Sequence, residues 1–278
     1  MSANLVTQPN SGARLRDLRT VLIWEGQIDN PRVRDLLGIK AVWASRLIAD
    51  LAADSSDIAY RQTSHSPLRI RPGASLPERG HSADDYLRVL LASEGASAEV
   101  EDCRRDLSVI SPTTFAMVAG AIRHGTGLKV AYRSMSNPAG APRLIYPHAV
   151  VRAPRRWHVR AWCDTRKDFR DFNFGRIAAI EALDQTAPAG RAEDKAWNTL
   201  ISVDVVAHPA LAPQQQKMIA DEYFPGVSAR KLKMRRCLIG YVIQELNIAT
   251  TPDTQLPPQF QLCVARPKDI LPLFPKDL

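Results

Sequence analysis

The 278-residue sequence has little of what marks exported, membrane-spanning or metal-binding proteins. Its four cysteines, at positions 103, 163, 237 and 263, lie far apart with no CxxC pair and no clustered histidines, which argues against a disulfide framework and a zinc site. No apolar run approaches the roughly 20 residues that cross a bilayer. The polar first residues lack the basic start and apolar stretch of a secretory signal. We therefore expect a protein of the reducing cytoplasm, with no metal, cofactor or membrane partner.

Positive charge is what the sequence has in excess, with a formal net charge of +8. Residues 111–180 contain twelve Lys and Arg against three Asp and Glu, whereas residues 13–72 contain ten against seven. A plain DNA-binding protein would concentrate its positive charge in the part that reads DNA. The charge therefore predicts an anionic partner and a second anion site in the middle of the chain.

The first part of the chain has the pattern of three helices followed by a hairpin. Apolar spacing predicts helices over residues 13–24, 31–38 and 40–53, and period-two alternation predicts paired strands over 58–61 and 68–71. Asp29-Asn30-Pro31 is typical of a helix start, and Gly38 permits a sharp turn between two helices. The spacing suits a helix-turn-helix with the hairpin as its wing, although Arg34 stands where such motifs usually hold a small residue.

In that interpretation the start of the third helix and the hairpin contact DNA, with Arg46 the first choice for a base contact. The positions expected to meet base edges and phosphates are Lys40, Ala41, Val42, Ser45, Arg46, Arg61 and Arg69. The alternative is an ordinary three-helix corner whose Lys40 and Arg46 are only solvated. The basic hairpin favours the first interpretation, because a wing can reach the adjacent DNA backbone or minor groove.

Beyond the turn-rich segment 72–77 we expect helices over residues 84–91 and 100–107, and another that starts at Ser111-Pro112. Four short β-rich segments follow, at 128–134, 143–151, 156–162 and 168–174, as a small barrel or curled sheet. A second linker is expected at 188–194. After it, the pattern predicts a strand over 201–206 and a helix over 213–224.

Alternation in the segment 156–162 predicts one apolar and one cationic face. Trp157, Val159 and Ala161 share the first, and the second carries Arg156, His158, Arg160 and Trp162. Guanidinium groups, imidazoles and a hydroxyl beside aromatic rings suit phosphates and bases. The side chains expected to bind an anionic ligand are Tyr132, Ser134, Arg143, His148, Arg156, His158, Arg160, Arg170 and Arg176. The alternative for any single arginine is that it only keeps the surface soluble.

Four blocks carry a resemblance to a known family. VAYRS at 130–134, RLIYPHAV at 143–150, RWHVRAWC at 156–163 and RDFNFGRI at 170–177 agree in order and spacing with a WYL domain, although Trp157-His158-Val159 replaces the Trp-Tyr-Leu that names it. The chain resembles bacterial regulators of this family, most of all repressors beside phage-defence operons such as BREX and CBASS. The resemblance implies an Sm-like β-barrel that senses a ligand and a C-terminal extension that dimerises.

We therefore expect an α+β protein with an N-terminal winged helix-turn-helix over residues 1–76 and a helical linker over 77–110. The WYL domain would follow at 111–190, and a small α/β dimerisation domain at 191–278. The expected function is a homodimeric repressor that binds double-stranded operator DNA under the control of an anionic ligand, such as a nucleotide or nucleic-acid fragment. The alternatives are a nucleic-acid-processing enzyme that uses His148 or His158 as acid or base, and an RNA-binding Sm-like module.

Overall fold

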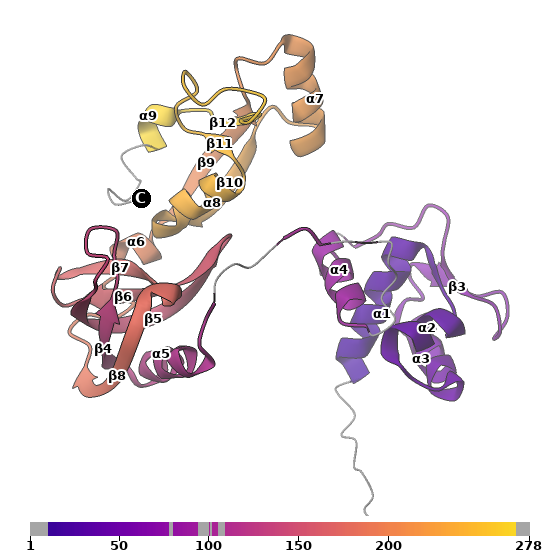
Figure 1. Cartoon of the computed structure of the whole chain (residues 1–278). Coiled ribbons are helices and arrows are strands. Elements are labelled where there is room, and N and C mark those ends of the chain that lie inside the picture. Colours follow the sequence, from indigo (N-terminus) through magenta and orange to yellow (C-terminus); the bar gives the residue numbers. More distant parts are fainter. Residues whose placement is uncertain (1–10, 78–79, 94–99, 101, 105–108, 271–278) are drawn as a thin grey trace, which may run out of the picture. The chain divides into compact units, whose positions relative to one another are not determined.

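The computed structural model describes residues 11–77, 80–93, 100, 102–104 and 109–270. The chain forms two compact units, residues 1–104 and residues 105–278, which we describe separately (Figure 1). Helices and sheets occur in both units, which confirms the expected mixed α+β class. In the described part of the chain no helix is long and apolar enough to span a membrane.

The first unit has helices where apolar spacing predicts them. They are α1 (Ser11–Glu25), α2 (Asn30–Leu37), α3 (Ala41–Asp54) and α4 (Ala83–Leu91). The Asp29 side chain accepts a hydrogen bond from the Arg32 backbone N–H at 2.9 Å and so caps α2. Gly38 ends that helix at φ +62°, a left-handed conformation that most side chains disfavour. The sharp turn between α2 and α3 follows from this cap.

A small antiparallel sheet completes the first unit. Its strands are β1 (Gln27–Ile28), β2 (Ala59–Tyr60) and β3 (Leu68–Ile70), in the order β1-β3-β2. The predicted hairpin is confirmed, with Tyr60 opposite Arg69. The alternation pattern missed β1, because a two-residue strand is too short to show a period.

The segment that the sequence assigns to a linker contributes α4 to the first unit. Val89 and Leu90 are buried in the same core as Leu18, Val21 and Leu22 of α1. A capping box starts the helix, since Ser82 and Asp85 each accept a hydrogen bond from the other's backbone N–H. Of the helix predicted over residues 100–107, positions 100 and 102–104 are not helical, and the other positions lie outside the described residues.

The second unit begins with α5 and a five-stranded antiparallel sheet. These elements are α5 (Pro112–His124), β4 (Thr126–Tyr132), β5 (Ala141–Ala153), β6 (Arg156–Cys163), β7 (Asp168–Asn173), the short 3-10 helix η1 (Phe174–Arg176) and β8 (Ile177–Thr186). The order is β7-β6-β5-β4-β8, with β7 and β8 at the two edges. Among the described strands no pairing joins these edges, so the closed Sm-like barrel is not confirmed. The helix α5 packs Val118 and Ala121 against one face of the sheet.

The rest of the second unit is a smaller helix-and-sheet module. It contains α6 (Lys195–Asn198), β9 (Leu200–Ala207), α7 (Pro213–Tyr223), β10 (Arg230–Arg235), η2 (Arg236–Leu238), α8 (Ile239–Glu245), β11 (Ile248–Ala249), β12 (Leu262–Val264) and α9 (Pro267–Ile270). Its sheet has the order β10-β9-β12-β11. The strand and helix predicted near residues 201–206 and 213–224 are confirmed as β9 and α7.

Two parts of the second unit meet on the sheet face opposite α5. Val151 of β5 is buried with Trp197 of α6 and Cys237 of η2. Figure 1 shows α5 and α6 on opposite sides of the five-stranded sheet. The face that alternation predicts to be cationic is therefore covered by the C-terminal segment of the same chain.

Candidate functional site

The helix α3 has one buried and one exposed face. Ala44, Ile48 and Leu51 are buried in the core, and the small Ala44 allows α2 to approach closely. The exposed side chains at the start of the helix are Lys40, Ala41, Val42, Trp43, Ser45 and Arg46. The five positions predicted to contact DNA on this helix thus share one accessible surface. Trp43, which is exposed beside them, was not among the predicted contact positions.

Contacts from α2 hold the start of α3 in place. The Asn30 side-chain amide donates to the Ala41 carbonyl oxygen and to the Ser45 hydroxyl oxygen, each at 2.8 Å. Arg34, the departure from the usual motif, is exposed and so does not disturb the packing between the helices. Ser45 is therefore oriented by α2, while Arg46 extends over the ring of Trp43, 4.9 Å from its centroid.

The two hairpin arginines predicted to contact DNA, Arg61 and Arg69, have different surroundings. The Arg61 guanidinium donates to the Ser66 carbonyl oxygen at 3.3 Å and also to the Ser64 carbonyl oxygen, so it closes the loop between β2 and β3. Arg69 is exposed on β3. Of the two, Arg69 is the one that presents its charge to solvent, and Arg61 shapes the loop.

The strand β6 follows the predicted alternation. Val159 and Ala161 are fully buried in the core that α5 covers. His158 and Arg160 point to the other face, but they are only 6% and 7% exposed. The predicted division of the side chains between two faces is therefore correct. The cationic face is not exposed, however, because the C-terminal segment covers it.

Arg160 is the centre of a buried ion-pair network. Its Nε and Nη2 atoms donate to the two carboxylate oxygens of Asp194 at 2.7 and 3.0 Å, and its Nη1 lies 3.4 Å from Asp171 Oδ1. Burial alone would lower the pKa of Arg160, but the two carboxylates outweigh it and raise that pKa further. The guanidinium is thus permanently charged and is already held by two carboxyl groups, those of Asp194 and Asp171.

Asp194 joins the sheet to α6. It is 1% exposed, and its carboxylate also accepts from the Trp197 backbone N–H at 3.0 Å, which caps α6. Burial alone would raise the pKa of Asp194, but the hydrogen bonds from His148 and Arg160 hold it well below its usual range. An ionised carboxylate therefore fixes the C-terminal segment to β6.

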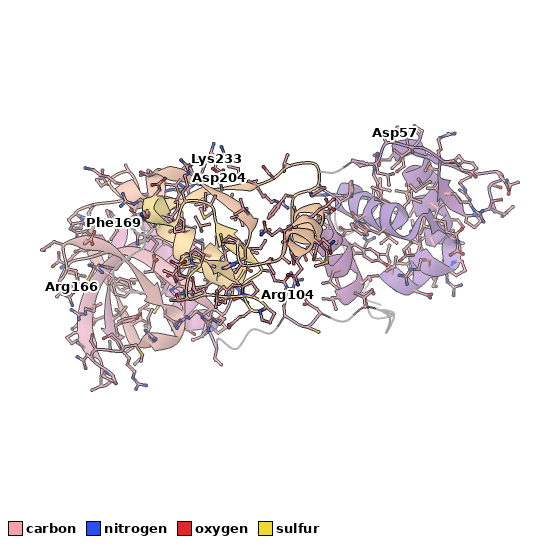
Figure 2. The ribbon with its side chains drawn as sticks, turned by 90° about the horizontal axis from the view of Figure 1, so that it is seen from above. Asp57, Arg104, Arg166, Phe169, Asp204 and Lys233 are labelled. Carbon is pink, nitrogen blue, oxygen red and sulfur yellow. The ribbon has the colours of Figure 1, made fainter. Side chains whose placement is uncertain are left out.

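A β-bulge brings His148 into the same network. The register between β5 and β6 shifts between Pro147 and Ala149, which leaves His148 unpaired in the ladder. Its Nε2 lies 3.0 Å from Asp194 Oδ2, and its ring contacts those of Trp197 and Phe169 edge-on (Phe169 is labelled in Figure 2). The bulge explains how a residue outside the simple alternation reaches Asp194.

His158 is covered by Tyr241 of α8. The two ring centroids lie 4.8 Å apart, and the tyrosine oxygen lies 3.5 Å from His158 Nδ1 while its hydroxyl donates to Asp171 Oδ2 at 3.1 Å. Burial, with the positive charges of Arg156 and Arg176, lowers the pKa of His158 to about 4. His158 is therefore neutral at pH 7. Neither this histidine nor His148 is placed as an exposed acid or base.

Arg156 and Arg176 differ from Arg160. Both are half-buried, and their charges act on His158 from β6 and η1. Within the described part of the chain, neither guanidinium forms an ion pair or a side-chain hydrogen bond. They are the positive charges beside His158 that remain uncompensated.

The structure does not bring the other predicted ligand residues to this face. Tyr132 packs edge-on against Phe172 in the core, and its hydroxyl accepts from the Asn173 backbone N–H at 3.1 Å. Ser134 accepts from the Asn137 backbone N–H in the turn after β4. Arg143 lies opposite Val130, and Arg170 lies opposite Ala161, so both arginines are on the sheet face that α5 covers. Arg170 also forms an ion pair with Asp168 at 3.4 Å.

Two carboxyl groups and two aromatic rings that were not predicted complete the network. They belong to Asp171, Asp194, Trp197 and Tyr241. Asp171 follows Arg170 on β7 and lies opposite Arg160 on β6. Alternation along β7 could therefore have predicted that it shares a sheet face with Arg160. Asp194 and Tyr241 come from distant segments, and no local pattern places them beside Arg160.

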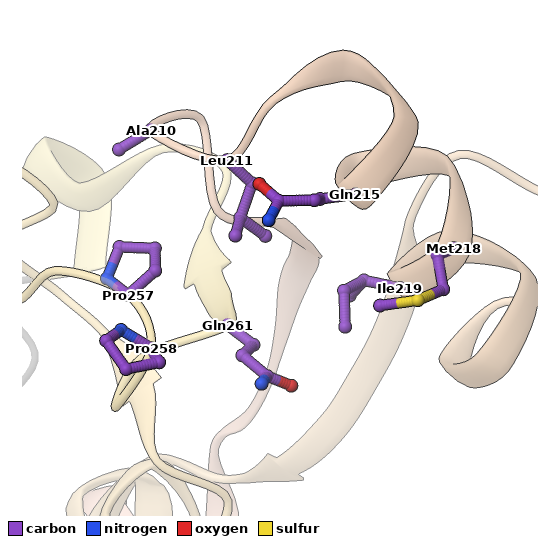
Figure 3. A pocket seen from close by; sticks show the side chains of 8 residues that line it. All are labelled: Ala210, Leu211, Gln215, Met218, Ile219, Pro257, Pro258 and Gln261. Carbon is purple, nitrogen blue, oxygen red and sulfur yellow. The ribbon is translucent and has the colours of Figure 1, made fainter.

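A separate cavity of about 320 Å³ lies in the C-terminal module (Figure 3). Its lining is apolar apart from two glutamines: Ala210, Leu211, Gln215, Met218, Ile219, Pro257, Pro258 and Gln261. With no charged side chain in its lining, this cavity does not suit an anion. The cationic side chains beside the five-stranded sheet are the better match for one.

Comparison with known families assigns both parts of the second unit. Residues 113–182 match the WYL domain, and residues 200–270 match the BrxR transcriptional regulator, C-terminal dimerization domain. The first match contains α5 and nearly all of the five-stranded sheet, and the second contains the C-terminal sheet with α7 and α8. The chain is thus a WYL-domain protein with a C-terminal dimerization domain.

Relatives extend the similarity over nearly the whole chain. The DNA-binding transcriptional repressor CapW of Pseudomonas aeruginosa is 30% identical over 272 residues, covering 92% of this chain and 89% of the relative. CapW of Escherichia coli (strain KTE188) is 31% identical over 276 residues, covering 94% and 90%. The chain belongs to the CapW family of transcriptional repressors. Proteasome accessory factor B/C of Arthrobacter aurescens aligns with a TM-score of 0.28 at 15% identity, over 97% of this chain and 49% of that one.

Proposed function

We propose that this protein is a homodimeric transcriptional repressor that binds double-stranded operator DNA through its first unit. The observation that carries the proposal is the surface of α3, which exposes Lys40 and Arg46 at its start while burying Ala44, Ile48 and Leu51 in the core. That arrangement suits a recognition helix, whose N-terminal residues meet base edges in the major groove. The name of the CapW relatives, which are DNA-binding repressors over nearly the same length, supports it.

In this proposal α2 and α3 are the helix-turn-helix, and the β2–β3 hairpin is the wing. Arg46 contacts a base, Lys40 contacts phosphate, and Arg69 reaches the adjacent backbone. Arg61 acts indirectly, because it holds the loop carbonyl oxygens of Ser64 and Ser66 and so fixes the shape of the hairpin. The protein works in the cytoplasm, where operator DNA is found.

The C-terminal module, matched to a dimerization domain, holds the two copies together. A two-fold dimer would place two copies of α3 on a palindromic operator, with half-site centres about one helical turn apart. The family resemblance to repressors beside phage-defence operons supports the same role here: the operator controls a defence operon of that kind.

The WYL sheet controls repression through an anionic effector of the class of nucleotides or nucleic-acid fragments. Arg156 and Arg176 bind it, since their charges lie near His158 and have no carboxylate partner within the described residues. Arg160 acts differently, because Asp194 and Asp171 already occupy its guanidinium. An effector beside His158 would act on the contact with Tyr241 of α8, and so on the C-terminal module that carries the dimer.

Selection of duplexes from a random-sequence library by the full-length protein tests the first part of this function. We expect enrichment of a palindromic sequence that the protein retards in a gel-shift titration, and little such binding by Arg46→Ala. Retention of structured RNA in preference to duplex DNA would contradict the proposal. So would cleavage of the duplex.

A further inference from the structure

Two tryptophans of the first unit are almost equally exposed, but only one of them is explained by packing. Trp24 is 49% exposed; its Nε1 donates to the His81 carbonyl oxygen at 2.9 Å and its ring stacks on Tyr86. Trp43 is 48% exposed, and within the described residues the only ring or hydrogen-bond partner of its side chain is the guanidinium of Arg46. Trp24 is thus part of the α1–α4 contact, whereas Trp43 lies on an open surface.

Trp43 does not stand alone on this surface. Val42 is 65% exposed beside it, so two large apolar side chains in succession face solvent at the start of α3. Apolar side chains stabilise the folded state when they are buried. Val42 and Trp43 are exposed, so they contribute little to the free energy of folding. An apolar pair in this position fits an interaction surface.

The charges around the pair indicate what covers it. Lys40 precedes it and Arg46 follows it, and residues 40–49 contain no Asp or Glu. A partner that is apolar in the centre, with an anionic group toward Lys40 and a hydrogen-bond acceptor toward Arg46, matches this pattern. The major groove of DNA has that chemistry where a thymine 5-methyl group lies between a backbone phosphate and the acceptor atoms of a neighbouring base pair.

We propose that Val42 and Trp43 read thymine methyl groups next to the base pair that Arg46 contacts. The proposal rests on the DNA-binding function above and adds to it the class of base that the operator must contain. The guanidinium of Arg46 lies over the Trp43 ring, 4.9 Å from its centroid, so a cation–π contact restricts Arg46 before DNA binds. Trp43 therefore has two roles, contact with the methyl group and orientation of Arg46.

Replacing thymine by deoxyuridine removes only the 5-methyl group and leaves the Watson–Crick edges unchanged. The probe is the duplex enriched from the random-sequence library, synthesised once with thymine and once with deoxyuridine throughout. We expect the wild-type protein to bind the deoxyuridine duplex about fourfold more weakly for each methyl group that it contacts in the thymine duplex. The double variant Val42→Ala/Trp43→Ala should bind both duplexes with equal affinity.

Leu91→Ala is the matched control, because Leu91 is 55% exposed on α4 of the same unit and should leave the thymine-to-deoxyuridine ratio unchanged. Trp43→Phe should retain part of the thymine-to-deoxyuridine affinity ratio, and circular dichroism checks that each variant is folded.

An affinity ratio in the double variant equal to that of the wild type overturns the inference, while the proposed DNA binding stands. If no duplex is enriched at all, the proposed function fails first. If the wild-type protein binds the thymine and deoxyuridine duplexes with equal affinity, the inference is wrong. A changed sedimentation coefficient of the double variant would then identify Val42 and Trp43 as a protein contact.

Discussion

Arg46 on α3 and Arg160 on β6 are both arginines that the sequence places on the polar side of an amphipathic element, but the folded chain surrounds them differently. Arg46 is exposed at the start of its helix. The side chain of Arg160 is 8% exposed and is held by two carboxylates, one of them from a segment 34 residues further along the chain. Sequence periodicity therefore gives the direction of a side chain, whereas packing of a distant segment determines whether its charge is free to bind a ligand.

The largest expected effect comes from breaking the buried pair. Asp194→Ala leaves the Arg160 guanidinium buried with only Asp171 beside it, and removing one partner of a buried ion pair destabilises a protein by about 3 to 5 kcal/mol. Chemical denaturation measures the decrease. The matched substitution on the exposed side, Arg46→Ala, should change the free energy of unfolding by less than about 0.5 kcal/mol.

A triple substitution separates loss of a partner from loss of the whole network. Arg160→Met, Asp171→Asn and Asp194→Leu together leave no buried guanidinium or carboxylate without its partner. This variant should be destabilised less than Asp194→Ala alone. If Asp194→Ala unfolds at the wild-type denaturant concentration, the pair does not hold the C-terminal segment to the sheet.

The second effect is on DNA binding, where Arg46 is the arginine expected to matter. Arg46→Ala should weaken binding to the selected operator duplex by about tenfold to a hundredfold, since one bidentate base contact contributes about 1 to 3 kcal/mol of discrimination. Gel-shift titration against the selected and an unrelated duplex separates base readout from general affinity. Equal decreases in affinity for both duplexes would assign Arg46 to phosphate contact and contradict its role in reading bases.

A further effect is the pH dependence of stability. Burial lowers the pKa of His158 from 6.5 to about 4, so between these values the unfolded chain binds a proton that the folded chain does not. The free energy of unfolding should therefore fall as the pH falls from 6.5 to 4, by at most about 1.4 kcal/mol per pH unit from this group. Denaturation at a series of pH values measures it, and His158→Phe should flatten the profile in this window.

Only a small effect on stability is expected at Arg156 and Arg176. Substituting both by alanine removes no ion pair formed within the described residues, so the change should stay within about 0.5 kcal/mol at each position. In a reporter strain the double variant should repress normally and fail to respond to the inducing condition. A normal response would show that the effector does not use these two guanidinium groups.

The sequence predicts local features of this fold well and distant contacts poorly. Asp29, Pro31 and Gly38 set the bounds of α2, because caps act on their own helix. Parity on β6 follows from alternation. The bulge at His148 was not predicted, although Pro147 directly before it is a residue that a central strand accommodates at a bulge, because proline donates no hydrogen bond to the ladder. The strand β8 was missed because its exposed positions show no period of two.

The candidate sites divide in the same way. The predicted positions on α3 share one exposed surface, since helical spacing alone brings them together. The ligand positions do not all meet, because Tyr132 enters the core through its contact with Phe172. Asp194 and Tyr241 reach the sheet only through tertiary packing, and a pattern read along one strand contains no information about them.

The salt dependence of operator affinity tests most directly the claim that DNA contact and effector control lie in different parts of the chain. Fluorescence anisotropy would measure it at several salt concentrations between about 50 and 200 mM, for the wild type and for Arg156→Ala/Arg176→Ala. We predict the same affinity and the same slope of log affinity against log salt for both. A weaker affinity with a slope shallower by about two, one for each phosphate that these guanidinium groups would neutralise, would place them on the operator and contradict the account.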